Sequence, residues 1–303
     1  MSEDIFLNVI DIEHFSTKDG DGIRTVVFLQ GCPLRCKWCH NPESQSATPI
    51  ALYDDKFCIG CRACVEACKS KAHSFDDNAH NIDRTLCTAC GECGKECCTG
   101  AVKLSSSAMS VDAILDEVEG DKAFYRNNGG LTVSGGEPLM YADKTIALLK
   151  SAKERGLNTV VETCGMFDSA VIPELVPLVD TFYWDVKDTD SERHKKNTGA
   201  SNERILENLK LADSLGAKTV LRCLLINTEN ITAEHANAIA DIYLSLKNCK
   251  MVHLLKYHAY AGNKAKLIGK EPNSDEKLIP TEAQVQEFFD ILKNRGVPVW
   301  VQE

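Results

Sequence analysis

Residues 25–40 read TVVFLQGCPLRCKWCH and place three cysteines directly after an apolar run. The first five residues are apolar or β-branched, which predicts a buried strand. Cys32, Cys36 and Cys39 follow with the spacing CxxxCxxC, so we expect their thiols on the loop at the carboxyl end of that strand. A cubane iron–sulfur cluster normally takes four thiolates. Three thiolates at this short range would leave one iron open to chelate a small molecule.

Two alternatives compete with this interpretation of the loop. The three thiols also fit a zinc site with His40 as the fourth ligand, or three reduced cysteines in a core. We favour the open iron–sulfur cluster, with Trp38 as the aromatic residue before the last cysteine.

Length, charge and cysteine content limit the class of protein. The 303 residues are 44% apolar, which is enough for one large α/β domain and a small one. The net charge of −10 argues against nucleic acid as the main partner. We expect no membrane helix, because no run of about 18 apolar residues occurs, and no secretory signal, because the first residues lack a basic region. Fifteen cysteines then indicate metal ligation in a reducing cytoplasm.

The chain divides by composition. Nine of the fifteen cysteines lie within 49–104, whereas predicted strands and helices alternate after residue 104. Alternation with short loops predicts a parallel α/β sheet made by 1–48 and 105–303, with 49–104 as an insert. The predicted strands are 25–29, 131–133, 159–161, 181–186, 218–226, 251–257 and 297–301, and the predicted helices are 141–155, 204–215, 233–246 and 281–294.

The insert contains two copies of C-x2-C-x2-C-x3-C, the pattern of two-cluster bacterial ferredoxins. The fourth cysteine of each run should bind the cluster of the other run. Cluster one would take Cys58, Cys61, Cys64 and Cys97, and cluster two would take Cys87, Cys90, Cys93 and Cys68. Two four-thiolate zinc sites are the alternative. Lys69 and Cys98 stand where a proline usually follows the fourth cysteine, and Cys98 is expected to be a free thiol.

Residues with possible chemical roles stand at the ends of successive predicted strands. Singly, each also fits a tight turn, a solvated strand end or a structural histidine. Together they predict one active-site mouth, because the carboxyl ends of parallel strands form the active site in α/β barrels. These residues are Gly135, Gly136, Glu137, Glu162, Thr163, Asp185, Lys187, Arg222 and His258.

The motifs, in order, resemble those of the glycyl radical enzyme activating enzymes of the radical S-adenosylmethionine (SAM) superfamily. The resemblance covers nearly the whole chain, and the insert is typical of the subgroup with two extra clusters. The position between Gly20 and Gly22 is often proline in that family and is Asp21 here. The matching segments are 16–24, 31–42, 134–138, 162–165, 185–187, 194–209 and 257–258.

The resemblance implies a partial (β/α)6 radical-SAM barrel with an inserted ferredoxin-like 2x[4Fe–4S] domain. Cys32, Cys36 and Cys39 would hold the catalytic [4Fe–4S] cluster, whose open iron binds SAM. The cofactor-binding residues would be Trp38, Gly135, Gly136, Glu137, Glu162, Thr163, Asp185, Lys187, Arg222 and His258, and a monovalent cation would bind near Glu162 and Asp185. The catalytic residues would be the three cysteines with Lys187 and Asp19, and Asp19 would lie where the glycine-bearing loop of the partner enters.

The implied reaction is reductive cleavage of SAM to methionine and a 5′-deoxyadenosyl radical, which abstracts hydrogen from a glycine of a partner glycyl radical enzyme. A ferredoxin or flavodoxin would donate the electrons, and the chain would act as a monomer. Two other functions remain open on the sequence: a radical-SAM enzyme that acts on a small molecule or another peptide, and an iron–sulfur electron-transfer protein. SAM cleavage assays with and without a glycyl radical protein would distinguish the first alternative from an activating enzyme. The iron content of the protein would distinguish the second.

Overall fold

The computed structural model describes residues 5–77, 79–271 and 275–302. Its centre is one nine-stranded sheet with the order β13-β12-β11-β10-β9-β8-β2-β1-β7. The strands from β13 to β2 run parallel, and β1 and β7 extend the sheet beyond β2 as antiparallel strands, with β7 at the edge. The strand bounds are β1 Phe6–Ser16, β2 Arg24–Leu29, β7 Ser107–Ser110, β8 Gly130–Gly135, β9 Asn158–Thr163, β10 Thr181–Asp185, β11 Thr219–Leu225, β12 Cys249–Lys256 and β13 Val299–Gln302.

The inner strands form around apolar and β-branched residues at their centres. Val26 and Val27 of β2 are both fully buried although their side chains point to opposite faces of the sheet. Such burial on both faces is typical of parallel strands that are covered by helices. Strand β2 therefore lies inside the sheet, between β1 and β8, and the cysteine loop starts from the middle of the fold.

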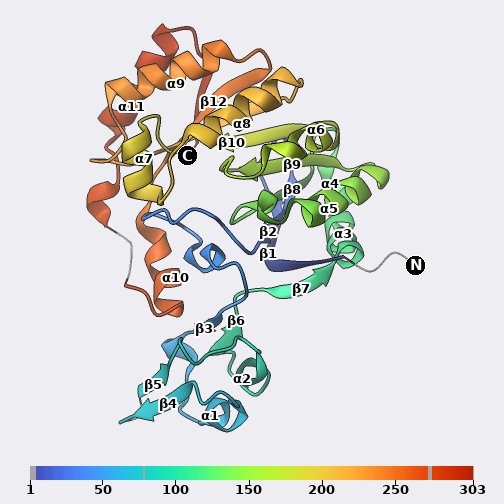
Figure 1. The fold of residues 1–303 in the computed structure, drawn as a ribbon, viewed down its shortest axis with the longest axis vertical. Helices are drawn as coiled ribbons and strands as arrows, with labels where there is room; N and C mark the ends of the chain where they lie inside the picture. The colour runs from blue at the N-terminus through green and yellow to red at the C-terminus, as the bar shows by residue number, and fades with distance from the viewer. Residues whose placement is uncertain (1–4, 78, 272–274, 303) are drawn as a thin grey trace.

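Amphipathic helices cover the sheet (Figure 1). Thr281 caps α11 in a capping box with Gln284, and Thr232 caps α9. The larger helices are α3 Val111–Gly120, α5 Ala142–Glu154, α7 Ser191–Thr198, α8 Glu203–Ser214, α9 Ala233–Ser245 and α11 Glu282–Asn294. Shorter ones are α4 Lys122–Tyr125, α6 Ile172–Leu175 and α10 Gly262–Leu267. In the described part of the chain, no helix is long and apolar enough to span a bilayer.

The cysteine-rich segment forms a separate lobe beside α10 at the lower end of the view in Figure 1. It consists of two small antiparallel sheets, β3 with β6 and β4 with β5, and two short helices. Its elements are β3 Ala51–Tyr53, α1 Ala63–Ala67, β4 His73–Asp76, β5 Ala79–Ile82, α2 Glu92–Lys95 and β6 Val102–Leu104. Its apolar core is very small: among the described residues, the buried cluster consists of Cys64, Cys93 and Val102.

Every strand and helix predicted from the sequence is present. The predicted count of six barrel strands is low, because seven parallel strands occur in the described residues once β13 is included. The sequence analysis also missed β1 and β7. Strand β1 alternates polar and apolar residues, with Leu7 and Val9 buried and most of the others exposed, so it lacks the continuous apolar run of the inner strands.

Candidate active site at the carboxyl ends of the strands

The cysteine loop after β2 is held against the end of α7. The backbone N–H of Arg35 donates to the carbonyl of Thr198 at 2.7 Å, and that of Lys37 donates to Asn197 at 3.0 Å. Cys36 and Trp38 are buried in a small apolar cluster, against which Cys32 and Cys39 pack. The three thiols therefore share one site whose backbone is fixed before any metal binds.

A fourth thiol belongs to this cluster. Cys164, directly after β9, is buried, and a side-chain hydrogen bond with it lowers the pKa of Cys32. Burial raises the pKa of Cys36 to about 12. All four cysteines are free thiols. The donor set is thus three closely spaced thiols on one loop with a fourth sulfur beside them.

The turn after β8 packs directly on the start of the cysteine loop. The N–H groups of Gly136 and Glu137 donate to the carbonyls of Leu29 at 2.9 Å and Gly31 at 2.7 Å. A Cβ atom on Gly136 would lie 2.1 Å from the Gly31 oxygen, so this approach requires glycine. The glycine pair therefore brings the end of β8 against the loop that carries the thiols.

Glu137 joins the ends of β8 and β9. It is 1% exposed. Its carboxylate accepts hydrogen bonds from the Thr163 hydroxyl at 2.8 and 2.9 Å, from the Cys164 N–H at 2.8 Å and from the Leu139 N–H at 3.0 Å. Burial raises the pKa of Glu137, and these donors oppose that shift. This predicted cofactor-binding residue thus holds the two strand ends in place.

Five charged residues from the mouth form a connected network. Lys187 Nζ lies 2.9 Å from Asp185 Oδ2. Arg222 forms an ion pair with Glu162 and lies 3.9 Å from Asp185 and 4.0 Å from Asp19. Burial alone would lower the pKa of Lys187, but Asp185 and the neighbouring thiols hold it well above its ordinary value. Lys187 therefore stays cationic beside the cysteine loop.

His258 lies at the rim of the site, directly after the end of β12. Its ring stacks on His40 with centroids 4.1 Å apart, and His40 donates a hydrogen bond to the His258 carbonyl at 3.2 Å. Arg222, by contrast, lies within β11 beside Tyr183. The structure thus brings together the predicted residues of the cysteine loop and strand ends, with His258 on the outer side next to the loop.

The comparisons with known proteins agree with this geometry. The family model described as the radical SAM superfamily matches residues 26–239. The chain belongs to the radical SAM superfamily. Radical SAM proteins use a [4Fe–4S] cluster and SAM, and the three-thiol loop fits such a cluster. The buried Trp38 N–H has no hydrogen-bond partner among the described residues, which leaves a donor at the same loop.

Named relatives show to which group of the radical SAM superfamily the chain belongs. The chain is 35% identical over 300 residues to the indoleacetate decarboxylase activating enzyme of Tractidigestivibacter scatoligenes, covering 95% of each. It is 38% identical over 277 residues, 89% of each, to the isethionate sulfite-lyase activating enzyme of Oleidesulfovibrio alaskensis. The choline trimethylamine-lyase activating enzyme of the same organism is 33% identical, covering 97% of each. This radical SAM protein is thus a glycyl radical enzyme activating enzyme, and the predicted function is confirmed.

A solved structure supports the fold alone. Streptococcus suis SuiB bound to the precursor peptide SuiA superposes with a TM-score of 0.55 at 13% identity. The match covers 92% of this chain and 48% of SuiB.

The insert of this radical SAM enzyme contains two small cavities lined by cysteines. One is lined by Cys58, Cys61, Cys64 and Cys97, and the other by Cys68, Cys87, Cys90 and Cys93. These are the two sets of four thiols predicted from the spacing. Cys98 is exposed and lines neither cavity.

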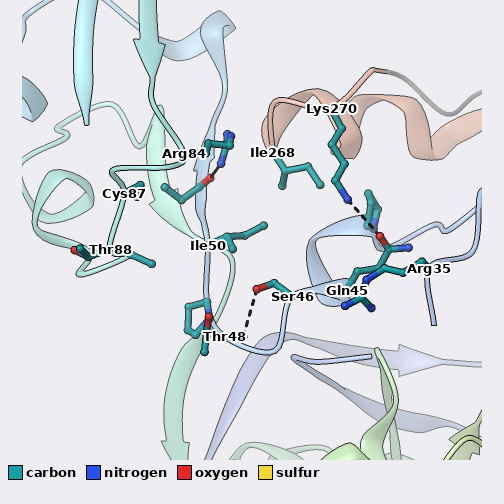
Figure 2. Close-up of a pocket in the computed structure, with 14 residues that line it drawn as sticks. Arg35, Gln45, Ser46, Thr48, Ile50, Arg84, Cys87, Thr88, Ile268 and Lys270 are labelled. Atoms are coloured by element: carbon teal, nitrogen blue, oxygen red, sulfur yellow. Dashed lines mark hydrogen bonds between the residues drawn. The ribbon is translucent and has the colours of Figure 1, made fainter. Parts of the chain in front are cut away.

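A larger cavity of about 400 Å³ lies between the insert and the rest of the chain (Figure 2). Arg84, Cys87 and Thr88 line its insert side, and Arg35 and Lys270 line the opposite side. Arg84 spans the junction, because it donates to the Ala51 carbonyl at 2.6 Å and to the Leu267 carbonyl at 3.0 Å.

Sequence reasoning missed three residues that the structure places beside predicted thiols. Cys164 follows Glu162 and Thr163, and its position at a strand end was the available signal. His73 and His80 lie between the two cysteine runs of the insert and carry no spacing motif. Only the fold shows that these side chains face cysteines.

Proposed function

We propose that this enzyme converts a partner glycyl radical enzyme to its radical form with three [4Fe–4S] clusters, one at the cysteine loop and two in the insert. The observation that carries the proposal is the convergence of Cys32, Cys36 and Cys39 with the glycine turn and the charged network at one mouth. Cys32, Cys36 and Cys39 would hold the catalytic cluster, which would supply the single electron for reductive cleavage of SAM to methionine and 5′-deoxyadenosine, with the hydrogen atom taken from a glycine Cα of the partner.

The chain's own residues bind and orient SAM in this proposal. Gly135 and Gly136 offer backbone close to the cysteine loop, Lys187 offers a cation to the SAM carboxylate or ribose, and Trp38 offers its free indole N–H. Glu137 positions Thr163 at the same mouth. His258 and Arg222 complete the walls, and Asp19, 4.0 Å from Arg222, marks the entry of the partner's glycine loop.

The proposed site also binds a monovalent cation. Glu162 accepts from Ser134 at 2.6 Å and pairs with Arg222, so its carboxylate already has two partners. Asp185 also has two cationic neighbours, Lys187 at 2.9 Å and Arg222 at 3.9 Å, but its side chain is 32% exposed against 12% for Glu162 and so has room for a further ligand. We therefore propose that the cation binds nearer Asp185.

The architecture of the insert supports the two additional clusters. Segments of about 50 residues rarely fold on an apolar core alone and usually need disulfides or metals. Here two of the three residues in the buried apolar cluster are cysteines, and no disulfide occurs among the described residues. Two cavities with four thiols each supply the missing stabilisation if each binds a cubane. Accordingly, the domains are residues 1–48 with 105–303, and residues 49–104.

The partners follow from the same reasoning. The relatives activate decarboxylases and lyases, and identities between 33% and 38% single out none of these partners. We propose a partner of this class, a ferredoxin or flavodoxin as electron donor, a monomeric activating enzyme and a cytoplasmic location.

The decisive experiment is anaerobic reconstitution followed by two measurements. The protein should bind about twelve irons, and with dithionite and SAM it should form 5′-deoxyadenosine. Mixing with candidate glycyl radical enzymes should give the doublet spectrum of a glycyl radical in one of them. Cys36→Ala should abolish SAM cleavage and keep about eight irons, whereas Cys98→Ser should change neither quantity. Wild-type cleavage by Cys36→Ala would overturn the assignment of the catalytic loop.

A further inference from the structure

Two buried histidines connect the two cysteine-lined cavities of the insert. His80 lines the cavity of Cys58, Cys61, Cys64 and Cys97, and His73 lines the cavity of the other four cysteines. They come from the paired strands β4 and β5. The two proposed cluster sites therefore have one imidazole each, and these imidazoles touch.

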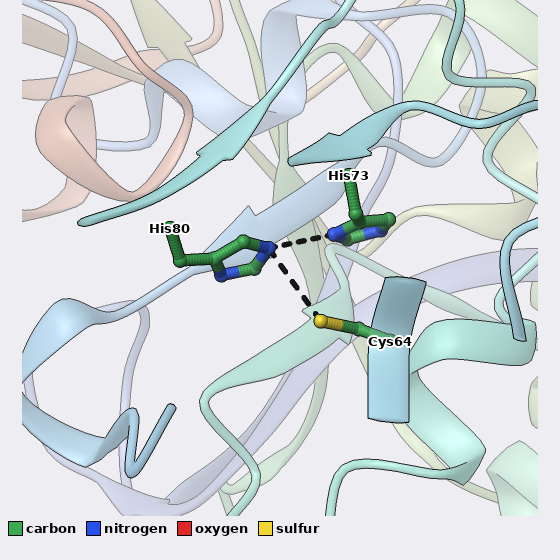
Figure 3. Close-up of side chains that lie close together, drawn as sticks. All are labelled: Cys64, His73 and His80. Atoms are coloured by element: carbon green, nitrogen blue, oxygen red, sulfur yellow. Dashed lines mark hydrogen bonds between the residues drawn. The ribbon is translucent and has the colours of Figure 1, made fainter. Parts of the chain in front are cut away.

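The contacts fix both rings. His80 Nε2 lies 2.8 Å from His73 Nδ1 and 3.6 Å from the Cys64 sulfur (Figure 3). Phe75 stacks on the other side of His80 with centroids 4.8 Å apart, and Tyr53 meets its ring edge-on at 4.4 Å. His73 and His80 are only 5% and 7% exposed. The position of His80 Nε2 is therefore set by packing on several sides.

The contacts of the His80 ring limit what each of its nitrogens can do. His80 Nδ1 is buried and has no partner among the described residues, whereas Nε2 has two. A proton on Nε2 makes a bond to either His73 or Cys64. A negatively charged thiolate sulfur is the stronger acceptor of the two.

We propose that His80 donates an Nε2–H hydrogen bond to the sulfur of Cys64 and thereby raises the reduction potential of the cluster held by Cys58, Cys61, Cys64 and Cys97. This inference rests on the proposed function, in which the insert holds two clusters. Hydrogen bonds to ligand sulfurs stabilise the reduced, more negative cluster and so raise its potential. Cys93 has the matching position in the second run, and none of its described hydrogen-bond partners is a histidine.

This difference between the two proposed clusters favours electron transfer in one direction. Cys87 of the second set also lines the large cavity next to the rest of the chain, and none of the first set does. The first cluster is therefore the outer one. A higher potential there favours uptake of an electron from an external donor, and His80 is a positioning residue for that step.

The test is a redox titration of the reconstituted full-length protein followed by electron paramagnetic resonance. Added SAM identifies the signal of the catalytic cluster. His80→Phe should keep about twelve irons and shift one of the other two clusters to a more negative potential. We expect its ratio of reduced to oxidised cluster to fall about tenfold at fixed potential, equivalent to about 59 mV for one electron.

Three further variants make the outcome unambiguous. His80→Gln keeps a donor near the Nε2 position and should restore most of the potential. Phe75→Leu loosens the packing that holds the His80 ring without removing a donor, so it should shift the same potential in the negative direction by less than His80→Phe does. His73→Phe removes the competing acceptor, so the same cluster should shift in the opposite, positive direction. This last variant tests the proposal even if His80→Phe does not fold.

The contrary results are distinct. Unchanged potentials in His80→Phe and His73→Phe at full iron content would mean that both histidines contribute only to packing. Loss of about four irons in both His80 variants would make His80 necessary for metal retention, which overturns the tuning role. Zinc in the insert, or only about four irons in the wild-type protein, would refute the two-cluster insert itself.

Discussion

At the scale of single residues, Lys187 and Asp185 form an ion pair whose contribution to the free energy depends on how exposed it is. Their side chains are 17% and 32% exposed, and Arg222 lies 3.9 Å from the same aspartate. Exposed pairs contribute little because water and salt screen them. A half-enclosed pair costs more to break, because the remaining charge loses both water and its partner. The pair is therefore better suited to hold a charged ligand than a surface strand end.

We predict that Asp185→Ala and Lys187→Ala each weaken SAM binding about tenfold, or ~1.4 kcal/mol, without loss of iron. The reason is that Lys187 would lose its partner in one variant and SAM would lose its cation in the other. Calorimetry on the reconstituted protein measures both dissociation constants. Lys150→Ala is a matched control, because Lys150 pairs with Glu174 at 2.6 Å where both side chains are 52% exposed. Dissociation constants within about twofold of wild type in both site variants would remove this pair from the site.

Sequence reasoning found most residues of the mouth but few of the contacts between them. Glu137 was selected because it follows two glycines at a strand end, and it does lie at the mouth. Its bonds to Thr163 and Cys164 join positions 26 and 27 residues apart, and only the register of β8 beside β9 brings them together. The pairing of Arg222 with Glu162 likewise depends on strands that are not neighbours in the sequence.

At the scale of elements, periodicity and end signals were sufficient for the inner strands and long helices. The capped helix Glu282–Asn294 carries its N-terminal signal at Thr281, and its last turn precedes a glycine. Strand β1 and the polar helix α7 were missed because neither has a strong apolar pattern, and helix α3 was missed although Ser110 caps it and one of its faces is buried. Helix α7 nevertheless matters, since the carbonyls at its end hold the cysteine loop. Tertiary contacts, rather than local propensity, place these elements.

The turn after β8 yields the prediction at this scale. Gly135 has a φ of +111°, and an added Cβ would lie 2.3 Å from the Leu29 nitrogen. Gly135→Ala should therefore force the turn away from the cysteine loop, lower retention of the catalytic iron and reduce SAM cleavage more than tenfold, for a cost above ~1.4 kcal/mol. Iron analysis and 5′-deoxyadenosine formation measure the two effects.

Gly156→Ala is the control for backbone strain alone. Gly156 also has a positive φ, +72°, but an added Cβ would meet no atom within 4 Å. This variant should lose about 1 kcal/mol of stability and keep its iron and its rate. Equal effects of the two substitutions on iron retention would mean that the close approach at Gly135 is unimportant for the site.

At the scale of the whole molecule, the chain joins a large sheet domain to a lobe that has almost no core of its own. The cavity of about 400 Å³ lies where they meet, with Cys87 on one side and Arg35 on the other. Arg35 donates to the Cys32 carbonyl at 2.6 Å, so this wall belongs to the cysteine loop. The ligands of the second proposed cluster thus lie on the route from the insert to the site where SAM would bind.

The last prediction follows from that route. If the insert clusters pass electrons inward, Cys61→Ala and Cys90→Ala should slow turnover with a ferredoxin or flavodoxin much more than turnover with dithionite, because a small reductant reaches the catalytic loop directly. Each variant should bind about eight irons instead of about twelve. Cys98→Ser changes an exposed cysteine outside both thiol sets and should behave as wild type with either donor. The comparison uses the ratio of the two rates within each variant, so a general loss of folded protein cancels. Equal slowing with both donors would assign the insert a structural or docking role and leave the catalytic loop to receive its electron without it.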